Sequence, residues 1–137
     1  MKNRNLEHKD HWATPRDFYN KLDAEFHFDF DPCPLHSDFD GLIIEWGKSN
    51  FVNPPYSRKL KEAFTHKALQ ESLKGKVCVL LLPVSTSTVI FHEIIRPNAE
   101  IRFLRGRLKF KGVNSTGEPS TGCGQHDSML VIFGGQK

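Results

Sequence analysis

The sequence has 137 residues, of which 38% are hydrophobic and 26% are charged, a composition typical of one globular domain. We expect a single domain over residues 1–137, with residues 1–11 flexible. The longest apolar run has about seven residues, far short of the roughly 20 that span a bilayer, so no membrane partner is expected. The polar start of the chain lacks the apolar core of a secretion signal, which predicts a cytoplasmic protein. A net charge of +3 is compatible with a nucleic-acid partner without requiring one.

The first half of the chain predicts one helix and several short strands. Residues 14–17 read as a helix start, with Thr at the N-cap and Pro at the first helical position. Phenylalanines alternate with acids in residues 28–31 and predict a short strand. Residues 41–44 favour another short strand, and residues 51–52 predict a third that leads directly into Asn53.

The second half alternates between helix and strand more clearly. Ser57 is the expected cap of a helix that stops at Gly75, and the apolar run 76–83 is typical of a strand buried on both faces. Residues 85–88 are expected to open a helix, capped by Ser85 or Ser87, that stops at Pro97. Late strands are predicted at residues 99–104, 108–110 and 129–133, with a loop at 112–126. This alternation predicts an α/β open sheet covered by helices.

The most informative motif is Asn53-Pro54-Pro55-Tyr56, at the junction between a predicted strand and a capped helix. Open α/β sheets bind ligands at such junctions. The two prolines stiffen the corner and remove two backbone donors, so the Asn53 side-chain carbonyl and a neighbouring backbone carbonyl can accept both hydrogens of a planar amino group. Tyr56 offers a ring on which a base can stack. The alternative is a rigid turn with Tyr56 packed on the core.

Five further stretches surround this motif, at residues 12–15, 28–33, 41–46, 80–88 and 99–108. With residues 51–57 they form an ordered set in which the chain resembles the phage-type DNA N6-adenine methyltransferases. The resemblance implies a reduced Rossmann-like methyltransferase fold: an open, mostly parallel sheet with a late antiparallel hairpin and helices on both faces. It also implies S-adenosylmethionine as cofactor, DNA as partner, and a phage or prophage protein that acts in a bacterial host.

The resemblance also implies roles for single residues. Asn53, Pro54, Pro55 and Tyr56 correspond to the catalytic corner, where Asn53 and the Pro54 carbonyl accept from the target amino group and Tyr56 stacks on the base. The residues implied in cofactor binding are Thr14 and Pro15, at the methionine end, and Asp31, Pro32 and Cys33, at the first cofactor motif. No Gly-x-Gly turn follows Asp31, in contrast to larger methyltransferases.

A basic stretch precedes the predicted 112–126 loop, and we expect Arg105, Arg107 and Lys109 to bind DNA phosphates. The alternative is that this basic stretch forms a solvent-exposed strand face with no role in binding. Two Cys-x-x-His pairs have weak zinc spacing, and no metal site is expected. Two other functions stay open: a methyltransferase with the same motif that acts on RNA or protein glutamine, and a degenerate, non-catalytic DNA-binding protein of the same fold.

Overall fold

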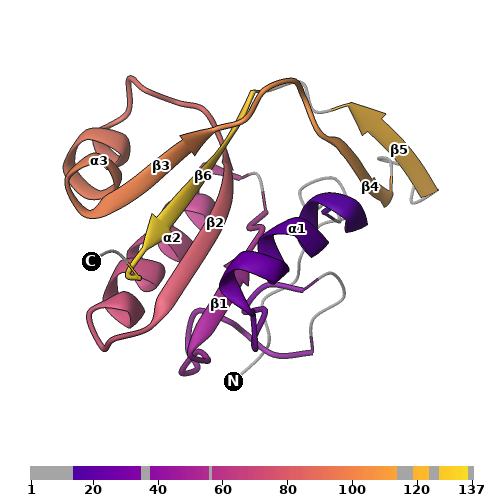
Figure 1. Cartoon of the computed structure of the whole chain (residues 1–137). Helices are drawn as coiled ribbons and strands as arrows, with labels where there is room; N and C mark the ends of the chain where they lie inside the picture. The colour runs from indigo at the N-terminus through magenta and orange to yellow at the C-terminus, as the bar shows by residue number, and fades with distance from the viewer. Residues whose placement is uncertain (1–13, 35–37, 56, 114–118, 124–126, 136–137) are drawn as a thin grey trace.

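The computed structural model describes residues 14–34, 38–55, 57–113, 119–123 and 127–135, and at 109–113 and 119–123 it describes the backbone alone. Helices and strands alternate along this part of the chain as far as the strand Ala99–Phe103, and three further strands follow without a helix between them (Figure 1). The elements are α1 (Arg16–Phe26), β1 (Ser49–Val52), α2 (Arg58–Ser72), β2 (Val77–Pro83), the π-helical turn η1 (Phe91–Ile95), α3 (Arg96–Asn98), β3 (Ala99–Phe103), β4 (Lys109–Val113), β5 (Pro119–Cys123) and β6 (Ser128–Phe133). The residues 1–11 that are expected to be flexible lie outside the described ones.

The main sheet has four strands in the order β1-β2-β6-β3. Strands β1 and β2 are parallel, whereas β6 is antiparallel to both of its neighbours, β2 and β3. The sheet is therefore mixed: β1, β2 and β3 run in one direction and β6 runs in the other, so the expectation of a mostly parallel sheet is confirmed only in part. The reason is topological: the chain leaves β3 and enters β6 at the same edge of the sheet, so β6 has to run back in the opposite direction.

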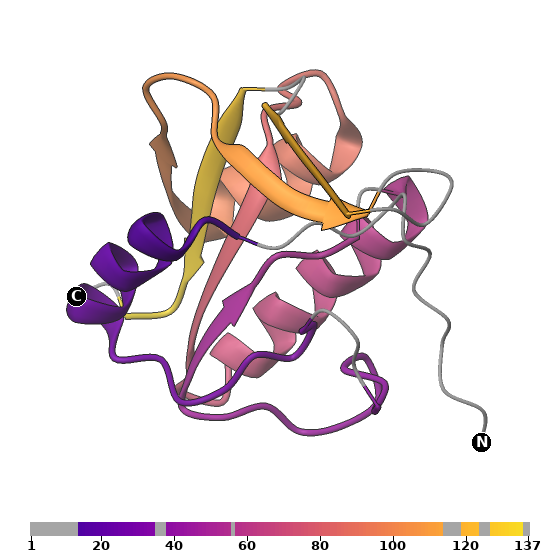
Figure 2. The ribbon, with the colours of Figure 1, turned by 90° about the vertical axis from the view of Figure 1, so that its right-hand side faces the viewer.

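Helices cover both faces of this sheet, as expected (Figure 2). On one face, Phe64 of α2 and Phe91 of η1 belong to the same core cluster as Leu80. On the other face, Leu22 of α1 packs with Val79 and neighbouring strand residues. The interior residues of β2 are buried on both sides, which confirms the prediction from the apolar run 76–83.

The segment before the first long strand lies beside β1. Phe30 forms an isolated parallel bridge with Asn50, and the Phe51 amide donates to the Phe30 carbonyl at 3.2 Å. The predicted strand at 28–31 is thus reduced to one bridge. The expected adjacency of the segments that end at Asp31 and Asn53 is confirmed, because both run in the same direction toward one edge of the sheet.

Two predictions about local structure in the first half are wrong. Residues 41–44 form a turn, because the Asp40 carboxylate accepts from the Leu42 amide at 2.9 Å and Asp40 also bonds the Ile43 amide through its carbonyl. Thr14 does not cap α1; Pro15 occupies the N-cap position, and no side chain caps the helix.

Two predictions in the second half are also corrected. The predicted cap at Ser85 or Ser87 is supplied by Thr88, whose hydroxyl accepts from the Phe91 amide at 3.2 Å. The expected loop 112–126 contains backbone pairing between β4 and β5, which form a separate antiparallel hairpin beside the main sheet (Figure 1). The Ser, Thr and Gly residues of β5 resemble a loop in composition, although pairing with β4 satisfies their backbone groups.

Candidate active site

The Asn-Pro-Pro corner follows β1 directly and is buried. Val52 ends the strand, and Asn53, Pro54 and Pro55 are each buried before α2 begins at Arg58. Neither proline has a backbone N–H group, so at these two positions the backbone offers carbonyl acceptors and no donors. The corner therefore presents acceptors at the carboxyl end of β1, where α/β sheets place ligands.

The amide of Asn53 is held in one orientation. Its Nδ2 donates a hydrogen bond of 3.0 Å to the hydroxyl of Thr14, which precedes α1. The opposite branch of the amide is the Oδ1 atom, which can only accept hydrogen bonds. The contact joins residues 39 positions apart in the sequence, and it orients the Asn53 amide relative to the start of α1.

Asp31 forms a tight turn at the same edge of the sheet. Its Oδ1 accepts from the Cys33 amide at 2.9 Å, an arrangement in which an aspartate side chain takes the place of a glycine-based turn. Burial raises the pKa of Asp31 to about 6, although the hydrogen bond from Cys33 opposes the rise. From the parallel bridge and strand spacing, the Cα atoms of Asp31 and Asn53 lie about 8 Å apart. The Asp31 carboxylate and the Asn53 amide thus belong to neighbouring segments at the same edge of the sheet.

Gly41 packs against the Asp31-Pro32-Cys33 turn. A Cβ atom at Gly41 would lie 1.8 Å from the Pro32 carbonyl oxygen, so no larger residue fits without a shift of the backbone. Trp46 fixes the other side of this contact, because its Nε1 donates to the Gly41 carbonyl at 2.7 Å. The missing side chain of Gly41 thus lets two backbone segments pack closely, ten positions after Asp31 in the chain.

A buried carboxylate supports Trp46 in turn. Glu71 of α2 is fully buried and accepts hydrogen bonds from the Trp46 amide (2.9 Å), Lys76 (2.6 Å), Lys74 (3.0 Å) and Lys67 (3.2 Å). Burial raises the pKa of Glu71, but these hydrogen bonds outweigh it, with Lys76 first, and hold the pKa well below its ordinary value. This network connects α2 to the turn at Asp31 through Trp46 and Gly41.

The other predicted site residues are placed as follows. Pro15 lies next to Thr14 at the start of α1, and Pro32 and Cys33 are buried in the Asp31 turn. Tyr56 lies outside the described residues, and of Lys109 only the backbone is described. The motif alone predicted the position of Asn53, but no local signal in the sequence indicated its contact with Thr14 or the support from Gly41 and Glu71.

The basic residues lie apart from the corner. Arg105 and Arg107 are exposed and follow β3, three strand positions from β1, which corresponds to about 14 Å. Arg107 pairs with Asp127 at 3.2 Å. Arg102, in the same stretch, contacts Glu25 of α1 at 2.7 Å and Glu100 at 2.6 Å. It therefore fastens α1 to the sheet, while Arg105 and Arg107 stay accessible.

Neither a metal-binding cluster nor a membrane-crossing helix is found in the described part of the chain. Its residues include no group of three or more His, Cys, Asp or Glu side chains arranged to hold a metal ion. The second Cys-x-x-His pair and His36 of the first fall where side chains are not described. Among the same residues, no helix has the length and apolar character needed to cross a bilayer.

Comparison with known proteins gives one match. The family model described as DNA N-6-adenine-methyltransferase (Dam) matches residues 2–137, which is nearly the whole chain and includes the corner, the Asp31 turn and the β4–β5 hairpin. No curated protein and no solved structure shows significant similarity.

Proposed function

The chain belongs to the DNA N-6-adenine-methyltransferase (Dam) family, and on this premise we propose that it transfers a methyl group from S-adenosylmethionine to the N6 amino group of adenine in DNA. The proposal includes a reduced Rossmann-like fold in a single domain over residues 1–137. Parallel strands with helices on both faces and one late reversed strand support that fold.

The observation that carries the proposal is the oriented amide of Asn53. With Nδ2 bound to Thr14, Oδ1 accepts one hydrogen of the adenine amino group and the Pro54 carbonyl accepts the other. Two acceptors favour a pyramidal nitrogen. Its lone pair would attack the methyl carbon as the bond from that carbon to sulfur breaks, and the surplus N6 proton would pass to solvent. Pro55 keeps this corner rigid, and Tyr56 stacks on the adenine. Most of the rate enhancement comes from positioning and from the fixed dipoles of these acceptors.

The residues around Asp31 fit a cationic cofactor. S-adenosylmethionine supplies an electrophilic methyl group on a positively charged sulfur when it is bound. A partly buried carboxylate with a pKa of about 6 is ionised at neutral pH and attracts such a charge. Pro32 and Cys33 belong to the same turn as Asp31, and Thr14, which is next to Pro15, contacts Asn53. We propose that these five residues hold the cofactor beside Asn53.

DNA has to present an unpaired base to this site. A duplex hides the adenine amino group, so the base is extruded or the strand is already unpaired, at a cost of a few kcal/mol. Arg105, Arg107 and Lys109 bind the phosphates in this proposal, and the β4–β5 hairpin beside the sheet contacts the flanking DNA.

We predict that Asn53→Ala abolishes methyl transfer and leaves S-adenosylmethionine binding nearly unchanged, because only the acceptor for the amino group is removed. Expression in a methylation-free host, followed by sequencing that reports N6-methyladenine, measures the first effect. Isothermal titration with the cofactor measures the second. Asn98→Ala, which removes an exposed asparagine at the end of α3, is the matched control and should retain full activity.

The same measurements separate the alternatives. Methylation of RNA or of a protein glutamine in a parallel assay, with none on DNA, would replace the substrate in this proposal. Absence of any heat at millimolar cofactor would instead indicate a non-catalytic binding protein. Loss of cofactor binding together with activity in Asn53→Ala would show that Asn53 has a structural role.

A further inference from the structure

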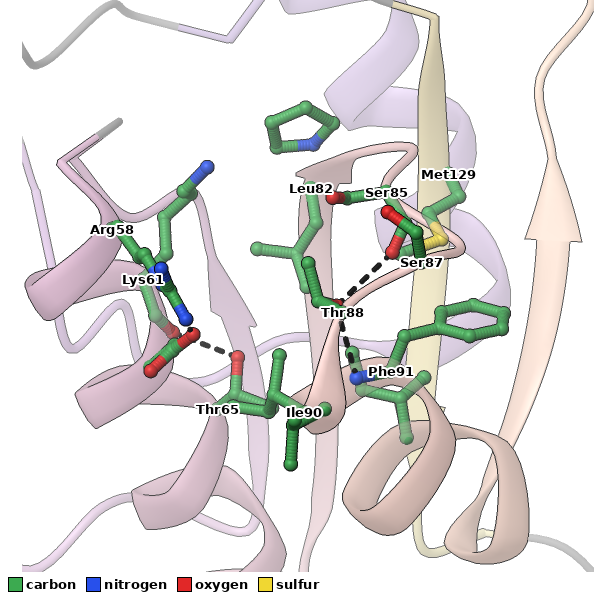
Figure 3. A pocket seen from close by; sticks show the side chains of 14 residues that line it. Arg58, Lys61, Thr65, Leu82, Ser85, Ser87, Thr88, Ile90, Phe91 and Met129 are labelled. Atoms are coloured by element: carbon green, nitrogen blue, oxygen red, sulfur yellow. Dashed lines mark hydrogen bonds and ion pairs between the residues drawn. The ribbon is translucent and has the colours of Figure 1, made fainter.

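A second feature at the same edge of the sheet is a pocket of about 420 Å³, which is within the range of ligand sites. It lies between α2, the loop after β2, η1 and the start of β6. Figure 3 shows Arg58 and Lys61 on one side and Ser85, Ser87 and Thr88 on the other, with Leu82 between them. Asn53, Pro54 and Pro55 do not line the pocket, so it is separate from the acceptor for the target adenine.

The pocket is close to the corner in space. Val52, the last residue of β1, pairs with Leu80 of β2 in parallel register, so the corner that follows Val52 and the pocket residue Leu82 lie at the same edge of the sheet. Arg58 follows Pro55 by three residues and therefore lies within about 11 Å of it. A DNA strand whose target adenine is held at Asn53 would bring a neighbouring nucleotide to the pocket.

The lining suits a nucleobase. Leu82, Phe91, Ile95 and Met129 line the pocket and are almost fully buried, so they provide an apolar floor. Hydroxyl groups of the loop after β2, including that of the exposed Ser87, surround this floor. A flat ring with polar edges needs this combination of apolar contact and peripheral hydrogen-bonding groups.

The charge of the pocket suits a phosphate. Arg58 is paired with Glu62 at 3.1 Å, whereas Lys61, which is partly buried, forms no ion pair with any described residue. Burial lowers the pKa of Lys61 because its ammonium loses water, although the nearby Glu62 carboxylate opposes this shift. An anionic group at this position would replace the missing hydration.

We propose that this pocket binds a nucleotide that neighbours the target adenine on the same DNA strand. The base lies against Leu82, Phe91 and Met129, and the phosphate contacts Lys61. The proposal rests on the proposed function and extends it, because a base held here contributes to the choice of which adenines are methylated. The ligand is chemically a nucleoside monophosphate, which is either part of a DNA strand or a free nucleotide.

The test compares two single-stranded oligonucleotides of about 12 nucleotides, a length that a single-strand groove covers. One is oligothymidylate, and the other is an abasic strand with the same number of phosphates. Binding of the full chain is measured by fluorescence anisotropy for the wild type, Ser87→Trp, Lys61→Ala and Lys59→Ala. The tryptophan fills the pocket from its rim, and Lys59 is a matched control, since it is exposed on α2 outside the pocket.

We expect Ser87→Trp to bind oligothymidylate about tenfold more weakly, the equivalent of one stacked base, and to bind the abasic strand as the wild type does. Lys61→Ala should reduce the slope of log K against log salt by about 0.7, the equivalent of one phosphate on a single strand. Lys59→Ala should change neither quantity. Thermal unfolding checks that each variant is folded. If Ser87→Trp does not fold, the salt dependence of Lys61→Ala tests the proposal by itself.

Three outcomes would overturn the proposal. One is an unchanged affinity of Ser87→Trp for oligothymidylate, and another is an equal weakening for both strands, which would mean a blocked DNA path without a base pocket. The third is free thymidine monophosphate binding as tightly as the oligonucleotide, which would assign the pocket to a free nucleotide.

The experiments test the proposed function and the proposed pocket separately. A protein that methylates adenine but shows no effect of Ser87→Trp keeps its function and loses this subsite. A protein that shows the base-dependent effect without methylation keeps the pocket as the nucleotide site of a binding protein.

Discussion

The hydrogen bond between Asn53 and Thr14 decides what the Asn-Pro-Pro corner offers to a ligand. An asparagine amide has a donor and an acceptor side, and the two are interchangeable unless a neighbour selects one. The Thr14 hydroxyl takes the donor at 3.0 Å. Proper orientation of the acceptor therefore depends on a residue outside the motif.

We predict that Thr14→Val lowers the rate of methyl transfer about tenfold, since it removes a hydrogen bond of about 1.4 kcal/mol that orients Asn53. Thr14→Ser keeps the hydroxyl and should restore the rate to near that of the wild type. Steady-state assays on methylation-free DNA measure both variants. Equal rates for the valine and serine variants would contradict a positioning role for the hydroxyl.

Asp31 gives the site a pH dependence. Its pKa of about 6 in the folded protein lies above the ordinary value for an aspartate, so the folded state binds the proton more tightly than the unfolded state does. Ionised Asp31 therefore costs stability, and this cost grows as the pH rises from about 4 to about 6. The buried carboxylate is retained at the edge where the proposed cationic cofactor would offset its charge.

We predict that S-adenosylmethionine binds about tenfold more weakly at pH 5 than at pH 7.5, because a carboxyl with a pKa of about 6 is mostly protonated at the lower pH. Isothermal titration at the two pH values measures the ratio. Asp31→Asn should bind weakly at both values with a ratio near one. A wild-type ratio near one would show that the Asp31 charge does not contact the cofactor.

At the scale of elements, the buried Glu71 connects α2 to the Asp31 turn. The connection runs from Glu71 to the Trp46 amide, and from the Trp46 indole to Gly41, which packs on Pro32. Each step involves groups that are buried or tightly packed, so the position of the turn depends on contacts that begin at α2. The network positions elements on the face of the sheet opposite α1.

We predict that Glu71→Gln lowers the free energy of unfolding by about 3 kcal/mol, because Lys67 and Lys76 lose their buried partner. Urea unfolding at pH 7 measures the change. Glu62→Gln, on the same helix, removes a more exposed ion pair with Arg58 and should cost less than about 1 kcal/mol. Equal effects of the two substitutions would contradict the argument from burial.

Because of Glu71, we also predict that the free energy of unfolding depends on pH in the acid range. Because the folded-state pKa of Glu71 is held below its ordinary value, its contribution to stability is present above about pH 4.5 and disappears as the pH falls. The unfolding free energy of the wild type should therefore decrease more steeply below pH 4.5 than that of Glu71→Gln.

At the scale of the whole molecule, the carboxyl edge of the sheet carries both the Asn-Pro-Pro corner and the basic stretch. Strand β3 runs parallel to β1 and β2, so Arg105 and Arg107 follow it at the edge where Asn53 lies. The strands that lead to the two places, β1 and β3, are about 14 Å apart across the sheet. A DNA strand that reaches the corner can also contact these arginines.

We predict that Arg105→Ala with Arg107→Ala weakens DNA binding and reduces the slope of log K against log salt by about 0.9 for each phosphate that the protein no longer binds. The control is Lys21→Ala with Lys48→Ala, which removes the same charge from exposed positions in α1 and before β1. Filter binding of duplex DNA from 50 to 200 mM salt measures the slopes. Equal slopes for the two double variants would assign the arginines to a solvated surface.

The sequence by itself determined the α/β class, the buried strand β2, the helix α2 and the corner after β1. These depend on local signals: an unbroken apolar run, helical spacing of apolar residues, and two prolines in succession. It also placed Asp31 beside Asn53, a juxtaposition that came from the resemblance and that the Phe30–Asn50 bridge bears out.

Only the tertiary structure decided the direction of β6, the pairing of β4 with β5, and the partners of Asn53, Gly41 and Glu71. A strand's direction depends on where the chain re-enters the sheet, and the partners lie 9 to 39 positions apart for the contacts described here. No periodicity or propensity within a short window contains that information, because such contacts arise only when distant segments pack against one another.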